Sequence, residues 1–144
     1  GKMQYRKDLA GVLAAHEIPY VAQSAITQNM KDLYEKAEKA IYTPGPAFLN
    51  VLAPCPRGWR YDTPKLLEIS KLAVDTCVWP LYEVVNGEWR LTYKPKEKLP
   101  VEEWLKPQGR FKHLFEKHNA HLIEDLQREV DIRWEKLLKL CGEA

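Results

Sequence analysis

The residue best suited to chemistry in this 144-residue sequence is Cys55, which lies between two prolines in the segment Pro54-Cys55-Pro56. A cysteine binds metal or attacks substrates as its thiolate, and a nearby cation such as Arg57 favours that form. A Cys-Pro step also ends the bacterial iron–sulfur motifs. The alternative is that Cys55 is a small buried hydrophobic residue. We favour a metal ligand because both flanking prolines restrict the backbone, although one cysteine cannot hold a cluster without ligands from elsewhere.

The other two cysteines, Cys77 and Cys141, are far from Cys55 and from each other, and no Cys-x-x-Cys pair is present. Both fall on the apolar faces of predicted helices, where we expect them to pack. Three widely spaced cysteines do not suit a secreted disulfide scaffold. We therefore expect a reducing, cytoplasmic location.

Three histidines, His113, His118 and His121, lie close together in the sequence. A zinc site needs three or four ligands in a tetrahedral arrangement, and no fourth ligand is evident nearby. We interpret the histidines as solvated or facing a partner protein, with a metal site as the less favoured alternative.

The charge balance argues against nucleic acid and membrane partners. The sequence has 22 Lys and Arg against 20 Asp and Glu, a net charge of +2. Such a balance gives little attraction for nucleic acid or anionic lipid. The segment 110–113 alternates basic and aromatic residues, as an RNA-binding strip does, but subunit docking explains it better. Residues are 45% hydrophobic and 29% charged, as in a globular protein, and no apolar stretch is long enough to span a bilayer.

The elements that must position Cys55 alternate between helix and strand. Asp8 caps a predicted helix, residues 18–22 form a strand, Thr27 caps a second helix, and residues 47–53 form a mostly buried strand. A third helix begins at Thr63-Pro64. This rhythm predicts an α/β fold with a parallel sheet. Cys55 then follows a strand at the edge where open α/β sheets bind ligands.

The second helix has two distinct faces in this prediction. Its apolar stripe consists of Met30, Leu33, Ala37, Ala40 and Ile41. The opposite face is predicted to be a solvated surface made of Lys31, Asp32, Glu35, Lys36, Glu38 and Lys39.

The second half of the chain follows a different pattern. Asn86-Gly87 is the strongest short signal for a β-hairpin, flanked by strand formers. Residues 94–107 contain three prolines and are predicted to be an arm outside the core. A long helix is predicted over residues 119–141, with an apolar stripe at Ile123, Leu126, Val130, Trp134, Leu137 and Cys141.

We therefore divide the chain into an α/β part, residues 1–79, and an extension for packing and subunit assembly, residues 80–144. The extension has apolar surface on its hairpin and its long helix. An α/β part of about 80 residues has limited surface to cover both, because small domains bury proportionally less. A large exposed apolar surface generally marks a site for a partner protein. We therefore expect this chain to form an oligomer.

Several segments in a fixed order resemble one enzyme family. The main ones are Ala53-Pro54-Cys55-Pro56-Arg57-Gly58-Trp59, Leu72-Ala73-Val74-Asp75-Thr76 and Trp79-Pro80-Leu81-Tyr82-Glu83. Further matching segments are residues 6–10, 16–22, 100–105 and 108–111. Together they resemble the C-terminal part of the β subunit of 2-oxoacid:ferredoxin oxidoreductases, whose leading member is the pyruvate enzyme, pyruvate synthase. Several motifs in the right order are more specific than one short pattern.

The resemblance implies a concrete function. Enzymes of this family oxidatively decarboxylate a 2-oxoacid on thiamin diphosphate with Mg²⁺, pass the acyl group to coenzyme A, and reduce ferredoxin through 4Fe–4S clusters. The β subunit carries the thiamin-diphosphate-binding fold and works with other subunits. By resemblance, Cys55 is the last ligand of the cluster nearest that cofactor, whereas Cys77 and Cys141 match no ligand.

The sequence also departs from the family pattern. It has no Gly-Asp-Gly segment, which holds Mg²⁺ and diphosphate in the family, and no second cysteine of cluster type. By itself this chain is expected to bind neither cofactor and to be inactive, with no catalytic or cofactor-binding residue of its own. The alternative function is a cofactor-free interaction module that keeps the fold without catalysis.

Overall fold

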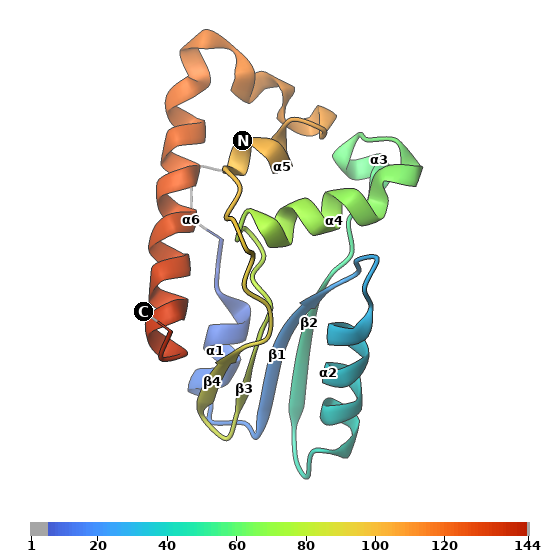
Figure 1. Ribbon diagram of the computed structural model, residues 1–144, viewed down its shortest axis with the longest axis vertical. Helices are drawn as coiled ribbons and strands as arrows, with labels where there is room; N and C mark the ends of the chain where they lie inside the picture. The colour runs from blue at the N-terminus through green and yellow to red at the C-terminus, as the bar shows by residue number, and fades with distance from the viewer. Residues whose placement is uncertain (1–5, 144) are drawn as a thin grey trace.

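Two parallel strands joined by a helix form the start of the sheet. The computed structural model describes residues 6–143. Strand β1 (Tyr20–Ala25) pairs in parallel with β2 (Ala47–Leu52), and α2 (Lys31–Tyr42) connects them and packs on both (Figure 1). Before them, α1 (Leu9–Ala15) begins where the Asp8 side chain accepts a hydrogen bond from the Gly11 amide, at 3.0 Å. This helix–strand–helix–strand order is the one predicted.

The β-hairpin extends the same sheet. Strand β3 (Tyr82–Val85) pairs antiparallel with β1, and β4 (Glu88–Leu91) pairs antiparallel with β3, so the order is β2-β1-β3-β4. Asn86 and Gly87 both have positive φ, 49° and 84°, as the predicted tight turn requires. The α/β class, the hairpin and the long final helix are confirmed, and the sheet is mixed because the hairpin runs antiparallel to β1.

The remaining helices complete the chain around this sheet. They are α3 (Pro56–Trp59), the 3₁₀ turn η1 (Thr63–Lys65), α4 (Leu66–Asp75), α5 (Val101–Leu105), the 3₁₀ segments η2 (Gly109–Phe115) and η3 (Lys117–Asn119), and α6 (Ala120–Leu140). Thr63-Pro64 begins a helical segment as predicted, but its first turn is 3₁₀ and the α-helix starts at Leu66.

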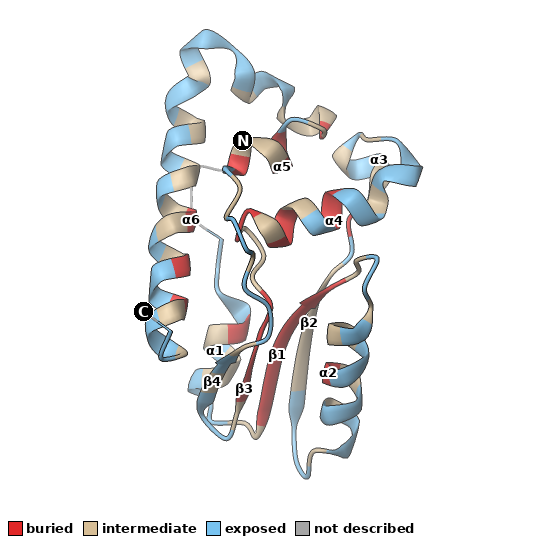
Figure 2. Cartoon of the chain, in the orientation of Figure 1, coloured by how far each residue is buried: buried red, intermediate tan, exposed pale blue. Residues whose placement is uncertain are grey.

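The main core lies on the face of the sheet opposite α2. Val21 and Val84 are cross-strand partners, and both pack in one cluster with Ala10 of α1, Ile69 of α4 and Leu105 of α5. Figure 2 shows the buried residues concentrated on β1, β3, α4 and the inner side of α6. Side chains alternate along a strand, so this core and α2 lie on opposite faces.

The prediction that residues 94–107 form an arm outside the core is wrong. Within this segment, α5 buries Val101, Trp104 and Leu105, which are 1%, 9% and 0% exposed. The prolines of the segment do not prevent this, because Pro100 stands directly before the helix and needs no helical partner for its nitrogen.

The final helix packs on its own chain. Val130, Trp134 and Leu137 from its predicted stripe are buried in the main core, and Ile123, Leu126 and Cys141 pack partly against it. The hairpin and α5 supply the surface that it covers, with contacts from α6 to β4 and to α5. The expectation that this stripe is left open for a partner is therefore wrong. The division at residue 79 stays a prediction, although β3 from the second part pairs directly with β1 from the first.

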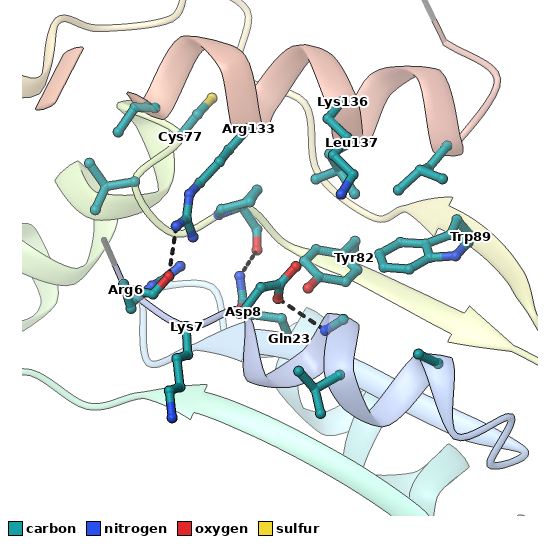
Figure 3. Close-up of a pocket in the computed structure, with 17 residues that line it drawn as sticks. Arg6, Lys7, Asp8, Gln23, Cys77, Tyr82, Trp89, Arg133, Lys136 and Leu137 are labelled. Carbon is teal, nitrogen blue, oxygen red and sulfur yellow. Dashed lines mark hydrogen bonds between the residues drawn. The ribbon is translucent and has the colours of Figure 1, made fainter. Parts of the chain in front are cut away.

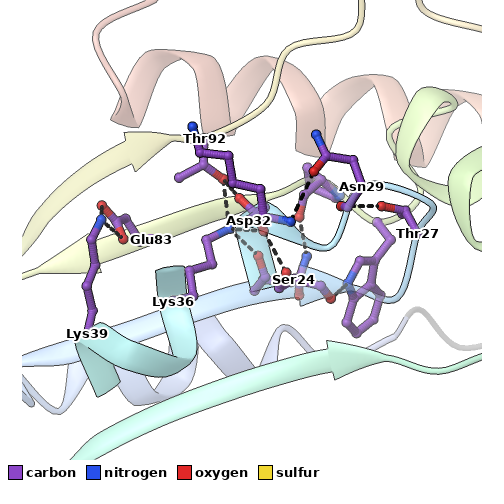
Figure 4. Close-up of polar contacts among 12 residues, drawn as sticks. Ser24, Thr27, Asn29, Asp32, Lys36, Lys39, Glu83 and Thr92 are labelled. Carbon is purple, nitrogen blue, oxygen red and sulfur yellow. Dashed lines mark hydrogen bonds and ion pairs between the residues drawn. The ribbon is translucent and has the colours of Figure 1, made fainter. Parts of the chain in front are cut away.

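The prediction of a fully solvated polar face on α2 is also wrong. Lys31, Glu35 and Glu38 are exposed, but Lys36 is only 1% exposed and lies against the sheet. Its ammonium donates hydrogen bonds to the Gln23 carbonyl, Asp32 and Thr92 at 2.8, 2.9 and 2.7 Å (Figure 4). The sheet is polar on this face, so it complements charged side chains.

A second ion pair continues this polar contact. Lys39 bridges both oxygens of the buried Glu83 carboxylate at 2.8 and 2.9 Å, and Tyr20 donates a hydrogen bond to the same carboxylate at 3.0 Å. Conversely, Ile41 from the predicted apolar stripe is 76% exposed. Thr27 does not cap this helix: its hydroxyl donates to the Asn29 carbonyl, and the Asn29 side chain accepts from the first helical amide, that of Lys31.

Candidate functional site

Cys55 lies in the loop that leaves β2, as predicted. It is exposed and occupies the N-cap of α3 in an extended conformation, with φ −99° and ψ 109°. Its carbonyl accepts a hydrogen bond from the Trp59 amide at 2.9 Å, which closes the single turn of the helix. Pro54 is buried beneath the loop and Pro56 begins the helix. The backbone around the thiol is therefore held while the sulfur remains accessible.

The loop is fastened to η2 at its far end. Arg60 ends α3 in the left-handed conformation (φ 59°), and its carbonyl accepts a hydrogen bond from the Gly109 amide at 2.9 Å. A Cβ atom at position 109 would lie 2.9 Å from that same oxygen, so the close approach requires glycine there. The segments 55–60 and 108–111, which are far apart in the sequence, thus form one unit.

A cluster of aromatic rings joins α3, α5 and η2. Trp59 and Trp104 meet edge to face with ring centroids 5.9 Å apart, and Trp104 meets Phe111 at 5.7 Å. The Arg110 guanidinium lies over the Trp59 ring, with its Cζ 3.8 Å from the centroid, and 4.4 Å from the Phe111 centroid. Partial burial lowers the pKa of Arg110 to about 10.

Two polar atoms of this cluster are buried without a hydrogen-bond partner in the part of the chain that the structure describes. They are the Tyr61 hydroxyl and the Trp104 indole nitrogen. Burial raises the pKa of the Tyr61 phenol, and the charge of Cys55 raises it further, whereas Arg110 opposes the change. The Tyr61 ring meets Trp59 edge to face with ring centroids 6.5 Å apart, which places Tyr61 in this cluster.

The other two cysteines have the packing positions that the sequence predicts. Cys77 is 4% exposed and belongs to the main core, and burial raises the pKa of its thiol to about 11. Cys141 is half-buried after α6, and burial raises the pKa of its thiol as well. A protonated, buried thiol is a poor metal ligand, so neither resembles the accessible thiol of Cys55.

The three histidines remain on the surface. His113, His118 and His121 are all exposed, and His118 lies 3.5 Å from the Glu116 carboxylate. Over residues 6–143, no group of three or more His, Cys, Asp and Glu side chains is arranged to hold a metal ion. Cys55 therefore belongs to no such group in those residues. None of the described helices is long and apolar enough to cross a membrane.

A cavity of about 740 Å³ lies away from the Cys55 loop, between α1, α6 and the hairpin (Figure 3). Its walls combine the apolar side chains of Tyr82, Trp89 and Leu137 with the cations Arg6 and Arg133. The Arg133 guanidinium donates to the Arg6 carbonyl at 2.6 Å, which joins α6 to the segment before α1. Cys55 does not line this cavity, so the candidate ligand faces the surface instead.

Sequence reasoning found Cys55 but missed the residues gathered around it. Trp104 and Arg110 fall within segments 100–105 and 108–111 that resemble the family, but no local signal assigned them or Tyr61 to the site. Tyr61 directly follows α3 in the chain, whereas Arg110 and Trp104 reach the cysteine loop only through the tertiary contacts of η2 and α5 with α3. Gly109, whose lack of a side chain permits the contact between η2 and α3, is a further signal in the sequence.

Comparison with known proteins gives a consistent answer. The chain is 48% identical over 141 residues to pyruvate synthase subunit PorB of Thermotoga maritima, an alignment that covers 97% of this chain and 43% of the relative. It is 44% identical over 131 residues to the PorB subunit of Methanocaldococcus jannaschii, covering 91% of this chain and 42% of that protein. It is 41% identical over 140 residues to ketoisovalerate oxidoreductase subunit VorB of Pyrococcus abyssi, covering 96% and 43%.

No protein-family model matches the chain. The chain spans less than half the length of the curated relatives it matches. These relatives are named as subunits of pyruvate synthase and of ketoisovalerate oxidoreductase, and the similarity extends over nearly all of the chain. The chain therefore belongs to the family of pyruvate synthase PorB subunits and corresponds to the C-terminal part of such a subunit.

Proposed function

We propose that this chain serves in a 2-oxoacid:ferredoxin oxidoreductase of the EC 1.2.7 type, where Cys55 is one ligand of a 4Fe–4S cluster. The proposal is supported by the accessible thiol at the end of β2, held between a buried proline and the first turn of α3. It is also supported by relatives that are named as pyruvate synthase and ketoisovalerate oxidoreductase subunits. In such a complex the substrates are a 2-oxoacid and coenzyme A, and ferredoxin accepts electrons in the cytoplasm.

The residues present fit the cluster as a source of one ligand. A 4Fe–4S cluster is usually held by four cysteine thiolates, and the other two cysteines of this chain are packing residues. The remaining ligands would come from other polypeptide segments. Gly58 lies close to the thiol: a Cβ atom there would be 3.8 Å from the Cys55 Sγ atom, an ordinary van der Waals contact.

The residues present do not fit thiamin diphosphate with Mg²⁺. The sequence has no Gly-Asp-Gly segment, and residues 6–143 contain no acidic cluster suited to a metal ion. When bound in the complete enzyme, that cofactor supplies decarboxylation and the cluster supplies one-electron transfer. The role of this chain is to hold iron through Cys55 and to pack against other segments through its exposed surface.

The test is the Cys55→Ser variant of the complete oxidoreductase complex. Serine oxygen is a harder and poorer ligand for iron than the thiolate, so we expect one cluster to be lost or altered. The measurements are iron and sulfide content and the electron paramagnetic resonance spectrum of the reduced enzyme. Thiamin-diphosphate content should not change, and electron transfer to ferredoxin should fall at least tenfold.

The matched control is Cys141→Ser, which makes the same chemical change at a half-buried packing position. We expect both Cys141→Ser and Cys77→Ser to leave the clusters intact. An unchanged cluster signal with full turnover in Cys55→Ser would show that the ligand assignment is wrong. That result would favour the second candidate, a cofactor-free interaction module.

A further inference from the structure

We propose that the cavity between α1, α6 and the β-hairpin binds a small organic carboxylate that carries an apolar body. Pockets for small molecules measure about 300–1,000 Å³ and combine apolar walls with a few charged or polar groups. This cavity of about 740 Å³ has both kinds of wall. Cys55 does not line it, so the site goes beyond the proposed function and does not depend on the ligand role of that residue.

The cavity reaches from the surface into the core. Its lining includes the buried residues Cys77, Tyr82 and Leu137. It also includes Val12 of α1, which is exposed. Because buried and exposed residues share its walls, the cavity extends below the surface of the molecule. A small molecule can fill such a cavity, whereas a helix or strand of a partner protein would contact only the exposed residues around its opening.

Aromatic rings form one wall of the cavity. Tyr82 of β3 and Trp89 of β4 stack with their ring centroids 5.4 Å apart and an angle of 23° between the rings. Figure 3 shows both rings facing the α6 side chains Lys136 and Leu137 across the cavity. Aromatic side chains offer a large apolar area and favour contact with other rings, so this wall suits the apolar body of a ligand.

Two arginines lie together at the other end of the cavity, away from Trp89 (Figure 3). The Arg133 guanidinium donates to the Arg6 carbonyl, and the Arg6 guanidinium lies over the Trp79 ring, with its Cζ 4.7 Å from the centroid. Lys7 also lines the cavity, but its ammonium points away from both arginines in Figure 3. Guanidinium groups bind carboxylates through paired, charge-assisted hydrogen bonds, so this end suits the anionic group of a ligand.

The positive charge at this end is only partly compensated. The carboxylate of Asp8 caps α1, and that of Glu129 pairs with Arg133 at 2.6 Å. Partial burial lowers the pKa of Arg6, and the charge of Arg133 lowers it further, whereas the two carboxylates oppose this change without reversing it. Lys136 adds another cation from α6. The remaining positive charge suits a single carboxylate better than a doubly charged phosphate.

The experiment is isothermal titration calorimetry of the complete oxidoreductase complex with cinnamate, a small aromatic carboxylate. Cinnamamide has the same ring and length without the charge, and it is the matched control ligand. Charge-assisted hydrogen bonds are roughly twice as strong as neutral ones. We therefore expect cinnamate to bind about tenfold more tightly than cinnamamide.

The variants test whether the ligand occupies this cavity. Arg6→Gln should weaken the binding of cinnamate by about tenfold and leave that of cinnamamide unchanged, whereas Arg6→Lys should lose less than about threefold. Lys136→Gln should weaken cinnamate binding by about threefold. Its matched control is Lys139→Gln, since Lys139 is an exposed cation of the same helix that does not line the cavity. Val12→Trp places a large side chain at the exposed opening and should weaken the binding of both ligands.

Three results would overturn the proposal. One is the absence of cinnamate binding to the wild-type complex. Another is binding that none of the cavity variants weakens, because the ligand would then occupy a different site. The third is equal affinity for cinnamate and cinnamamide, because the site would then not select a carboxylate. If Arg6→Gln prevents assembly of the complex, the comparison of Lys136→Gln with Lys139→Gln decides in the same way.

Discussion

Replacing Lys36 by Met tests whether the polar contact between α2 and the sheet is essential for folding. The Lys36 side chain is 1% exposed, and its ammonium donates to the Gln23 carbonyl, Asp32 and Thr92. Burial lowers the pKa of Lys36, although the neighbouring Asp32 carboxylate opposes the change. The charge is therefore costly to bury and is tolerated because all three of its protons have acceptors.

The expected loss in the free energy of unfolding follows from the groups that lose a partner in Lys36→Met. Methionine fills a similar volume but donates no hydrogen bond, so the Gln23 carbonyl loses a partner inside the protein. Asp32 keeps the Ser24 and Thr92 hydroxyls as donors, at 2.6 and 2.5 Å, but loses its counter-charge. Removing one partner of a buried ion pair costs about 3–5 kcal/mol, and we expect Lys36→Met to fall in this range.

The assay is urea unfolding of the 144-residue chain followed by circular dichroism. Lys31→Met is the matched control, because Lys31 is on the same helix, has a 73% exposed side chain, and should change stability by less than about 0.5 kcal/mol. The double variant Lys36→Met/Asp32→Asn should lose less than the sum of the two single losses. A loss below about 1 kcal/mol for Lys36→Met, or one equal to that of Lys31→Met, would refute the reasoning.

Two further predictions concern the core. Leu105→Ala should lower the free energy of unfolding by about 2–5 kcal/mol because Leu105 is fully buried. The control Ile41→Ala changes a 76% exposed position and should have little effect. Equal losses of stability in thermal unfolding of the two variants would contradict the burial of Leu105 in the core. Burial raises the pKa of Cys77 from 9.0 to about 11, so between these pH values the unfolded thiol ionises first. The stability of wild type relative to Cys77→Ala should then fall by about 1.4 kcal/mol per pH unit, and a difference that does not change with pH would contradict this.

The parts of this protein that sequence alone predicted are those controlled by neighbouring residues. Asp8 begins α1 and Asn86-Gly87 forms the hairpin turn, because a cap or a tight turn depends on a few adjacent residues. Cys55 was placed correctly after β2 for the same reason: the prolines and the preceding apolar run are local signals. The family resemblance also rested on continuous segments, and comparison with curated relatives agrees with it.

The environment of these elements was decided only by tertiary structure. Sequence patterns assume that charged side chains face water, yet Lys36 is buried because β1 and β3 present polar groups to α2. The prolines and lysines of segment 94–107 predict an open arm, yet α5 within this segment packs in the core. Arg110 lies against the Cys55 loop only because Gly109 lets two distant segments approach. Local chemistry determines turns, caps and strands, whereas the pairing of surfaces far apart in the chain decides which side chains are buried and which lie against the cysteine loop.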